Sequence, residues 1–201
     1  MVRLALERAP DVADPGRFLR SVPAWGALAG LMLLAGGGAL LASRWSPATV
    51  AVVHVFTLGV LGNALFGSLL QFLPAAAGVR LPVGAWWAHG LHSTFNRGAA
   101  ALVAGFWWTS PGLRAAGAIG LVLAFFELVV VALPGVLAKA RGSLLHAGIS
   151  LSLVAALATA AMGALLVAAM PLDQLLLETD APDQPDSDHR GERNEDRKSV
   201  V

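Results

Sequence analysis

The sequence predicts an all-α protein, a multi-pass bundle of about five transmembrane helices. Hydrophobic residues make up 56% of the 201 positions and charged residues only 13%, with a mean hydropathy of +0.67. This composition lies outside the usual range of soluble domains and is typical of a membrane protein. The charges are also segregated, because only Glu127 among the 13 acidic residues lies between Asp14 and Asp173. A helix is the expected form of each span, since bilayer hydrocarbon offers the backbone no hydrogen-bond partners.

Five apolar stretches are long enough to cross the hydrocarbon core, which takes about 20 residues. Turn and interface residues separate them, including Ser46-Pro47 before the second stretch and Ser110-Pro111 before the fourth. Because the breaks are short, consecutive helices are expected to run antiparallel. The predicted spans cover residues 24–42, 48–74, 84–108, 113–137 and 144–170.

The basic residues predict the orientation of the bundle, because they gather on the cytoplasmic side of inner-membrane proteins. A cytoplasmic N-terminus places seven of them inside, at positions 3, 8, 17, 20, 80, 139 and 141. It leaves two outside, Arg44 and Arg114. We therefore predict an inner (cytoplasmic) membrane protein with its N-terminus inside and its C-terminus outside.

The two ends of the chain differ in composition from the predicted bundle, residues 23–171. Residues 1–22 form a polar segment that is expected in the cytoplasm. Residues 172–201 are rich in Asp, Glu and Pro and are predicted to be a disordered acidic tail, because they cannot bury enough apolar area to fold. The net charge of +1 argues against a nucleic-acid partner, and the absence of cysteine excludes disulfides and thiolate metal sites.

The third predicted span contains the stretch "AHGLHSTFNRG", residues 88–98, which is polar for a membrane helix. At about 100° per residue, its polar side chains share an arc of about 140°. Polar groups in hydrocarbon normally face the bundle interior, a partner or a water-filled cavity. We expect this face to be directed inward. It comprises His89, His92, Ser93, Asn96 and Arg97.

Glu127, in the fourth predicted span, is the expected partner of Arg97. The tight turn at residues 110–112 makes the third and fourth spans antiparallel neighbours. Counting residues from this turn places Arg97 and Glu127 about 3 Å apart in depth. A structural ion pair between them is therefore predicted. The sequence allows two roles for it, fixing the packing of the two helices or forming part of a functional site.

Four histidines are candidate metal ligands. His89 and His92 are three residues apart and project from one helix face, although this spacing alone is a weak motif. His146 opens the fifth span from the same side of the membrane, where a hydrogen-bonded interfacial role is the alternative. His54 enters from the opposite side, on a helix whose Gly59, Asn63, Gly67 and Gln71 recur every four residues and indicate close helix packing.

The run "RWSPATVAVVHVFTLGVLGNALFGSLLQFLPAAAG", residues 44–78, resembles a pattern in bacterial membrane proteins of the NnrS family and, more remotely, in subunit I of heme-copper oxidases. The resemblance covers about 60 residues, corresponding to the first half of these relatives. It implies that His54 is an axial ligand of a heme b near the outer surface. In the oxidases the opposite ligand comes from a later span that this chain lacks, so the second ligand here would be His92, a group of a second copy of the chain, or no protein group. Arg97 is the residue expected to pair with a propionate.

Two functions follow from these observations. The first is a heme-binding membrane protein related to oxidase subunit I or NnrS proteins. The second is a non-enzymatic bundle that acts as a subunit of a membrane complex, or as a proton or metal-ion conduit through the polar residues of the third and fourth spans. In either case the expected partners are the lipid bilayer and a second copy or another membrane subunit. The isolated chain is not expected to be an enzyme.

Overall fold

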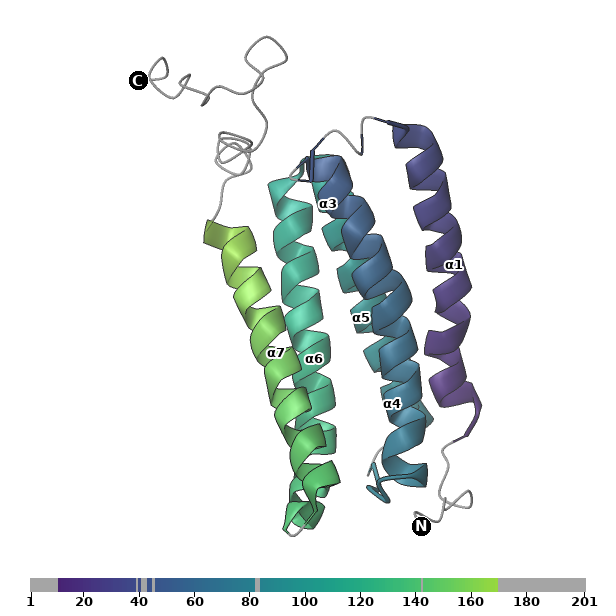
Figure 1. Cartoon of the computed structure of the whole chain (residues 1–201), viewed down its shortest axis with the longest axis vertical. Helices are drawn as coiled ribbons and strands as arrows, with labels where there is room; N and C mark the ends of the chain where they lie inside the picture. Colours follow the sequence, from purple (N-terminus) through teal and green to yellow (C-terminus); the bar gives the residue numbers. More distant parts are fainter. Residues whose placement is uncertain are drawn as a thin grey trace, which may run out of the picture.

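A computed structural model describes residues 11–38, 40, 43–44, 46–81, 84–141 and 143–169. Within this part of the chain the fold is entirely helical, as predicted, with five long helical rods lying side by side (Figure 1). The predicted tail, residues 172–201, lies outside the described residues, as do residues 1–10.

Four of the rods are single α-helices, and the second is composite. The single helices are α1 (Ala13–Gly36), α5 (Ala85–Trp107), α6 (Pro111–Ala140) and α7 (Leu144–Ala169). The composite rod runs through α3 (Pro47–His54), the π-helix η2 (Val55–Gly62) and α4 (Asn63–Ala75). The rods are arranged with α1 and α7 at opposite edges, while α5 lies behind the composite rod in this view (Figure 1).

Two Ser-Pro pairs set the starts of helices, as the sequence indicates. Ser46 Oγ accepts a hydrogen bond from Thr49 N at 3.1 Å, with Pro47 as the first helical residue. Ser110 Oγ accepts one from Leu113 N at 3.5 Å, with Pro111 in the same place. The serine satisfies a free backbone N–H, and proline has no N–H to satisfy at this position.

The first helix begins at Ala13, well before the predicted start of the span at residue 24. Its early turns are polar in composition but bury Pro15 and Phe18. An apolar window therefore misses them, because only one face of these turns is hydrophobic. The helix ends at Gly36, and Gly37 follows with a φ of 52°, a left-handed conformation that glycine adopts without strain.

Glycines allow α5 and α6 to pack backbone against backbone. A Cβ on Gly117 would lie 2.3 Å from Leu102 N, and one on Gly105 would lie 2.5 Å from Arg114 N. A Cβ on Gly98 would lie 2.9 Å from Leu121 N. These contacts fix the relative depth of the two helices.

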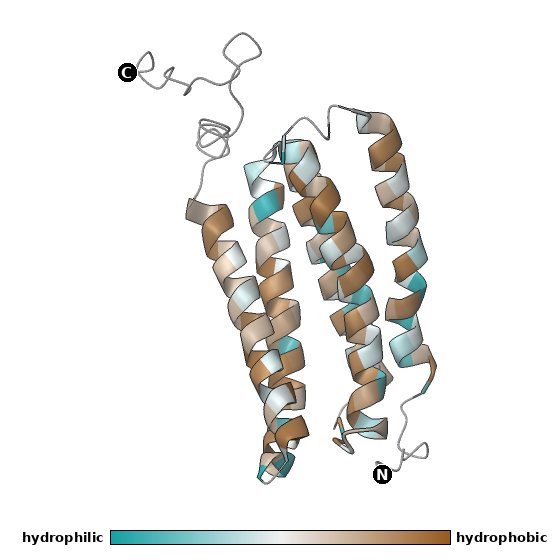
Figure 2. Ribbon diagram, in the orientation of Figure 1, coloured by the Kyte–Doolittle hydropathy of each residue, from teal (hydrophilic) through white to brown (hydrophobic). Residues whose placement is uncertain are grey.

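Four helical segments among the described residues are long and apolar enough to cross a membrane: α1, the composite rod, α6 and α7. Hydrophobic residues run along most of their length (Figure 2). The remaining rod, α5, is not apolar enough to meet this criterion, because it carries the polar stretch 88–98. It is instead the most enclosed helix, packed on α1, α3, η2 and α6.

Candidate functional site

The centre of the candidate site is a reciprocal pair of amides that joins the composite rod to α5. Asn63 Nδ2 donates to Asn96 Oδ1 at 3.0 Å, and Asn96 Nδ2 donates to Asn63 Oδ1 at 3.0 Å. Trp25 Nε1, on α1, donates to the same Asn96 Oδ1 at 2.7 Å. Hydrogen bonds between side chains therefore connect three of the five rods at one point.

The two amides use all their N–H groups. The second hydrogen of Asn63 Nδ2 goes to Gly59 O at 2.8 Å, and that of Asn96 Nδ2 goes to His92 O at 3.0 Å. Asn63 is completely buried. A buried amide with every donor satisfied is a stable packing element, whereas an unsatisfied one is expensive.

The π-helix η2 lies immediately before Asn63 and accommodates Trp25. A Cβ on Gly59 would lie 2.4 Å from Trp25 Cδ2, so the indole ring rests directly on the helix backbone. The absence of a side chain at Gly59 therefore lets the tryptophan approach Asn96. Segments of π-helix often occur where a helix must place a functional side chain, and here η2 separates His54 from Asn63.

His92 extends the polar cluster toward the start of α5. Its Nε2 lies 2.8 Å from Ser21 Oγ, and its ring packs edge-on against Phe18 with 5.0 Å between ring centroids. Ser21 Oγ is also within hydrogen-bond distance of Arg17 O, at 3.2 Å. The serine hydroxyl thus bridges His92 and the backbone of α1.

His89 lies at the end of this chain of contacts and is exposed. Its Nδ1 is 3.4 Å from Arg17 Nη1, and because arginine only donates, Nδ1 is the acceptor. Two buried atoms nearby, Arg17 Nε and Asp14 Oδ1, have no partner among the described residues.

The structure divides the predicted inward face of α5 between two sides of the helix. His92 and Asn96 face α1 and the composite rod, as the hydrogen bonds above show. His89 and Arg97 are exposed, together with Trp86. The expectation of an inward position was therefore wrong for Arg97, whereas His89 remains on the side of α1, where it contacts Arg17, but is exposed near the start of the helix. Only part of the arc of about 140° fits into the contact with α1.

The structure forms no ion pair between Arg97 and Glu127 within its described residues. The glycine contacts place Gly98 opposite Leu121 and Leu102 opposite Gly117, so that Glu127 is level with His92. Arg97 and Glu127 are then about five residues apart in depth, or about 7.5 Å, instead of the expected 3 Å. The glycine packing, and not the charges, sets the register of α5 and α6.

His54 lies near the opposite end of the bundle. Its Nδ1 is 2.7 Å from Val50 O, and its ring stacks on Phe106 with 5.1 Å between centroids. Since a carbonyl oxygen only accepts, Nδ1 carries the proton. The guanidinium carbon of the buried Arg114 lies 5.8 Å from the centroid of the same Phe106 ring, and Arg114 Nη1 has no partner among the described residues.

His146 is a hydrogen-bonded residue at the start of α7. Its Nδ1 lies 2.7 Å from Ser143 Oγ and its Nε2 lies 2.8 Å from Ala77 O. The imidazole therefore ties α7 to the loop after α4, and both ring nitrogens are occupied. The structure shows the interfacial arrangement that was the alternative to metal binding.

The four histidines do not assemble into one site. His89 and His92 lie near the start of α5, His54 lies near the end of α3, and His146 has both nitrogens engaged. In the part of the chain that the structure describes, no group of three or more His, Asp or Glu side chains is placed to hold a metal ion.

Sequence reasoning missed the three residues of α1 that complete the site. Arg17, Ser21 and Trp25 recur every four residues and form a polar stripe on one face of the helix. The signal was visible in the sequence, but a helix start at residue 24 excluded most of it. Extending the helix by three turns would have revealed the face that meets α5.

Comparison with known proteins gives one partial match. A family model described as TatD related DNase matches residues 134–200, about a third of the chain. Comparisons with curated proteins and with solved structures give no match. The matched segment covers the end of α6, all of α7 and the residues that follow it, which lie outside the described part.

The family match corrects the resemblance inferred from residues 44–78. The family model that matches is that of TatD related DNases and not that of NnrS proteins or heme-copper oxidases, so the predicted relationship, and the oxidase-like function drawn from it, were wrong. The assignment of His54, His92 and Arg97 as heme contacts rested on that relationship.

The match covers too little of the chain to establish a family. Between residues 134 and 169 the chain contains no acidic side chain, and its charged residues are Lys139 and Arg141. The described part of the matched segment therefore supplies no carboxylate for hydrolytic chemistry.

Proposed function

We propose that this protein is a non-enzymatic, polytopic subunit of a complex in the cytoplasmic membrane, and that it docks on its partner through the outward side of α5. Large apolar side chains on the edge helices support the membrane setting. Leu34 on α1 is 82% exposed, and Leu144 and Leu151 on α7 are 93% and 71% exposed. Exposure of such apolar surfaces to water is unfavourable, whereas burial against lipid or another membrane helix is favourable.

The observation that carries the docking proposal is the exposure of Arg97 on α5. Arg97 is near the middle of this helix, far from either membrane surface if the bundle spans the bilayer. A charged arginine at the centre of a membrane helix costs about 2.5–3.5 kcal/mol on insertion scales, unless a partner or water receives it. A protein partner that covers this face removes the cost.

Glu127 provides a reason to favour a second copy of the chain as the partner. It lies two helical turns beyond Gly120. A Cβ on Gly120 would lie 3.1 Å from Gly98 Cα, so Gly120 faces α5. Glu127 is therefore on the side of α6 that adjoins α5, and no ion pair within the described residues neutralises it. In a two-fold dimer, Arg97 of one protomer would pair with Glu127 of the other.

The conduit function has less support. The polar cluster ends at Asn63 and Asn96, where every amide N–H is already used. Next to it, the rings of Phe18, Phe66 and Phe95 are in mutual contact and fully buried. Beyond Arg97, α5 contains no further charged residue. A pathway for ions would need polar groups across the whole depth of the bundle.

Charge exchange tests the docking proposal. The mass of the detergent-solubilised full chain would be measured for wild type, Arg97→Glu, Glu127→Arg and the double variant. We expect wild type to dimerise, each single variant to lose association, and the double variant to regain it. Arg20→Glu, an exposed charge reversal near the start of α1, is the matched control and should leave the dimer intact.

Other outcomes would contradict parts of the proposal. A wild-type protein that stays monomeric up to high micromolar concentration would exclude the second copy as partner. Equal association of Arg97→Glu and wild type would exclude docking through this face. Cleavage of DNA by the purified chain would favour the nuclease function suggested by the partial family match over a non-enzymatic subunit.

A further inference from the structure

A cavity of about 410 Å³ lies between the composite rod and α7, near the end of the bundle that contains His54. Residues of α5 and α6, among them Leu102 and Phe125, also line it. Its size is in the usual range for small-molecule sites, and its walls are almost entirely apolar. The polar side chains in its lining are those of His54, Thr57 and Thr159.

The polar hydrogens of these three side chains are all engaged in hydrogen bonds to backbone carbonyls of their own helices. Thr57 Oγ1 donates to Val53 O and Thr159 Oγ1 donates to Ala155 O, both at 2.9 Å. His54 donates from Nδ1 to Val50 O at 2.7 Å. A neutral imidazole then carries a lone pair on Nε2, on the side of the ring away from its own helix backbone. The cavity therefore offers hydrogen-bond acceptors and no donors from these side chains.

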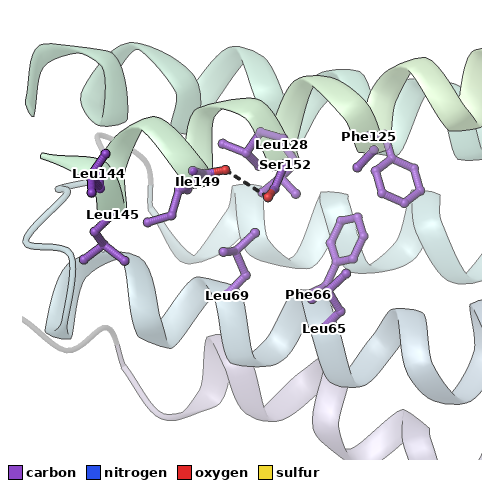
Figure 3. A pocket seen from close by; sticks show the side chains of 12 residues that line it. Leu65, Phe66, Leu69, Phe125, Leu128, Leu144, Leu145, Ile149 and Ser152 are labelled. Atoms are coloured by element: carbon purple, nitrogen blue, oxygen red, sulfur yellow. Dashed lines mark hydrogen bonds between the residues drawn. The ribbon is translucent and has the colours of Figure 1, made fainter. Parts of the chain in front are cut away.

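A second cavity of about 460 Å³ adjoins the first along the same groove. The two share Leu65, Phe125 and Ala156 in their linings. Figure 3 shows the apolar side chains that line this second cavity, with Leu65, Phe66 and Leu69 of α4 facing the residues of α7. The hydroxyl of Ser152 in this lining is also not free to donate to a ligand, because Oγ donates to Gly148 O at 2.9 Å (Figure 3).

We propose that this double cavity binds a lipid-soluble phenol, of the kind formed by a hydroquinone ring with an apolar tail. The phenolic hydroxyl donates to His54 Nε2, the ring packs beside Phe125, and the tail lies in the second cavity. Imidazole nitrogen is a strong acceptor and phenol is a better donor than an aliphatic alcohol. An oxidised quinone carries only acceptors, so its oxygens would face the lone pairs of His54 and the two threonines.

This inference is independent of the docking proposal. The cavity lies between the composite rod and α7, whereas Arg97 is on the outward side of α5. Binding can therefore be measured on detergent-solubilised protein whether or not the chain dimerises. A negative result for one proposal therefore leaves the other standing.

The experiment is a titration of the purified full chain with three ligands that share one decyl tail: the hydroquinone, its dimethyl ether and the quinone. Native mass spectrometry or the shift in thermal denaturation temperature reports binding. We expect the hydroquinone to bind saturably, at least about tenfold more tightly than the ether or the quinone, because one unpaired buried polar group costs about 1–3 kcal/mol.

Two variants locate the site. His54→Phe keeps an aromatic ring next to Phe106 but removes the acceptor, and it should lower hydroquinone affinity about tenfold or more while leaving affinity for the ether unchanged. Gln71→Ala, at an exposed residue of α4 outside both cavities, is the control and should bind like wild type.

Equal binding of all three ligands would overturn the proposal, because it would show a groove that accepts any apolar tail. Unchanged hydroquinone affinity in His54→Phe would overturn it as well. If His54→Phe does not fold, the comparison of hydroquinone with its ether in the wild-type protein still decides whether the hydroxyl is recognised.

Discussion

Asn63 and Asn96 are neutral residues in a place where a charged pair would be costly to bury. Two amides facing each other exchange two hydrogen bonds, and each has one N–H left for a backbone carbonyl of its own helix. The geometry leaves no charge to desolvate and no donor unpaired. Such a pair fixes both the rotation and the depth of α5 relative to the composite rod, because a one-residue shift would break both bonds.

A double-mutant cycle measures this coupling. We expect Asn63→Ala and Asn96→Ala each to lower the free energy of unfolding by about 1–3 kcal/mol, since each leaves the other amide unpaired. The double variant should lose less than the sum, with a coupling of about 0.5–1.5 kcal/mol, the range found between membrane helices. Unfolding in mixed detergent micelles provides the measurement.

The control for this cycle is Gln71→Ala, an exposed amide on α4. It should change the free energy of unfolding by no more than about 0.5 kcal/mol. Strictly additive effects of the two asparagine substitutions would show that the amides do not act on each other.

Helical periodicity explains why these residues could be predicted only in part. The pattern of 88–98 placed His92 and Asn96 on one face, and the structure confirms that both form hydrogen bonds with α1. The same pattern included His89 and Arg97, which are exposed. Periodicity gives the angle of a side chain around its own helix. It does not give the width of the contact, which depends on the residues of α1.

The contact between α5 and α6 depends on glycine rather than on charge. Gly117 and Gly105 bring backbone atoms of the two helices within a distance that any side chain would prevent. Close approach gains dispersion contacts along the whole seam and sets one register. The sequence contains these glycines, but their alignment across two helices cannot be counted from a turn whose length is uncertain by a few residues. The predicted ion pair failed for this reason.

Substitution of Gly117 by alanine tests the seam. The new Cβ would lie 2.3 Å from Leu102 N, and backbone cannot rotate away as a side chain would. We expect α5 and α6 to move apart and the free energy of unfolding to fall by about 1–3 kcal/mol. Gly112→Ala, in the first turn of the same helix with open space around it, should be neutral or slightly stabilising. Equal thermal stability of both variants would show that the seam adapts without loss.

Helix starts show which elements were predictable. The two Ser-Pro pairs act locally, so the starts of α3 and α6 follow from a few residues each. The start of α1 does not, because its polar turns become stable only by packing Phe18 against the aromatic cluster of α4 and α5. Hydropathy along the chain contains no information on that tertiary contact.

The bundle as a whole is asymmetric in charge. Among the described residues, five basic side chains lie at the end where α1 begins: Arg17, Arg20, Arg80, Lys139 and Arg141. Arg44 and Arg114 lie toward the opposite end. Because there are five rods in antiparallel order, the start of α1 and the end of α7 lie at opposite ends of the bundle (Figure 1). This distribution supports an orientation with the start of α1 in the cytoplasm.

Single cysteines test the orientation, because the natural chain contains none. Gly112→Cys, in the exposed first turn of α6, should react with a membrane-impermeant maleimide on intact spheroplasts. Arg141→Cys, exposed after the end of α6, should react only after the membrane is permeabilised. Arg141→Cys leaves most of the basic residues on its side unchanged, so the charge bias that orients the bundle persists. The reverse pattern would mean that the chain inserts with its N-terminus outside, and labelling of both sites from outside would mean that α6 does not span the membrane.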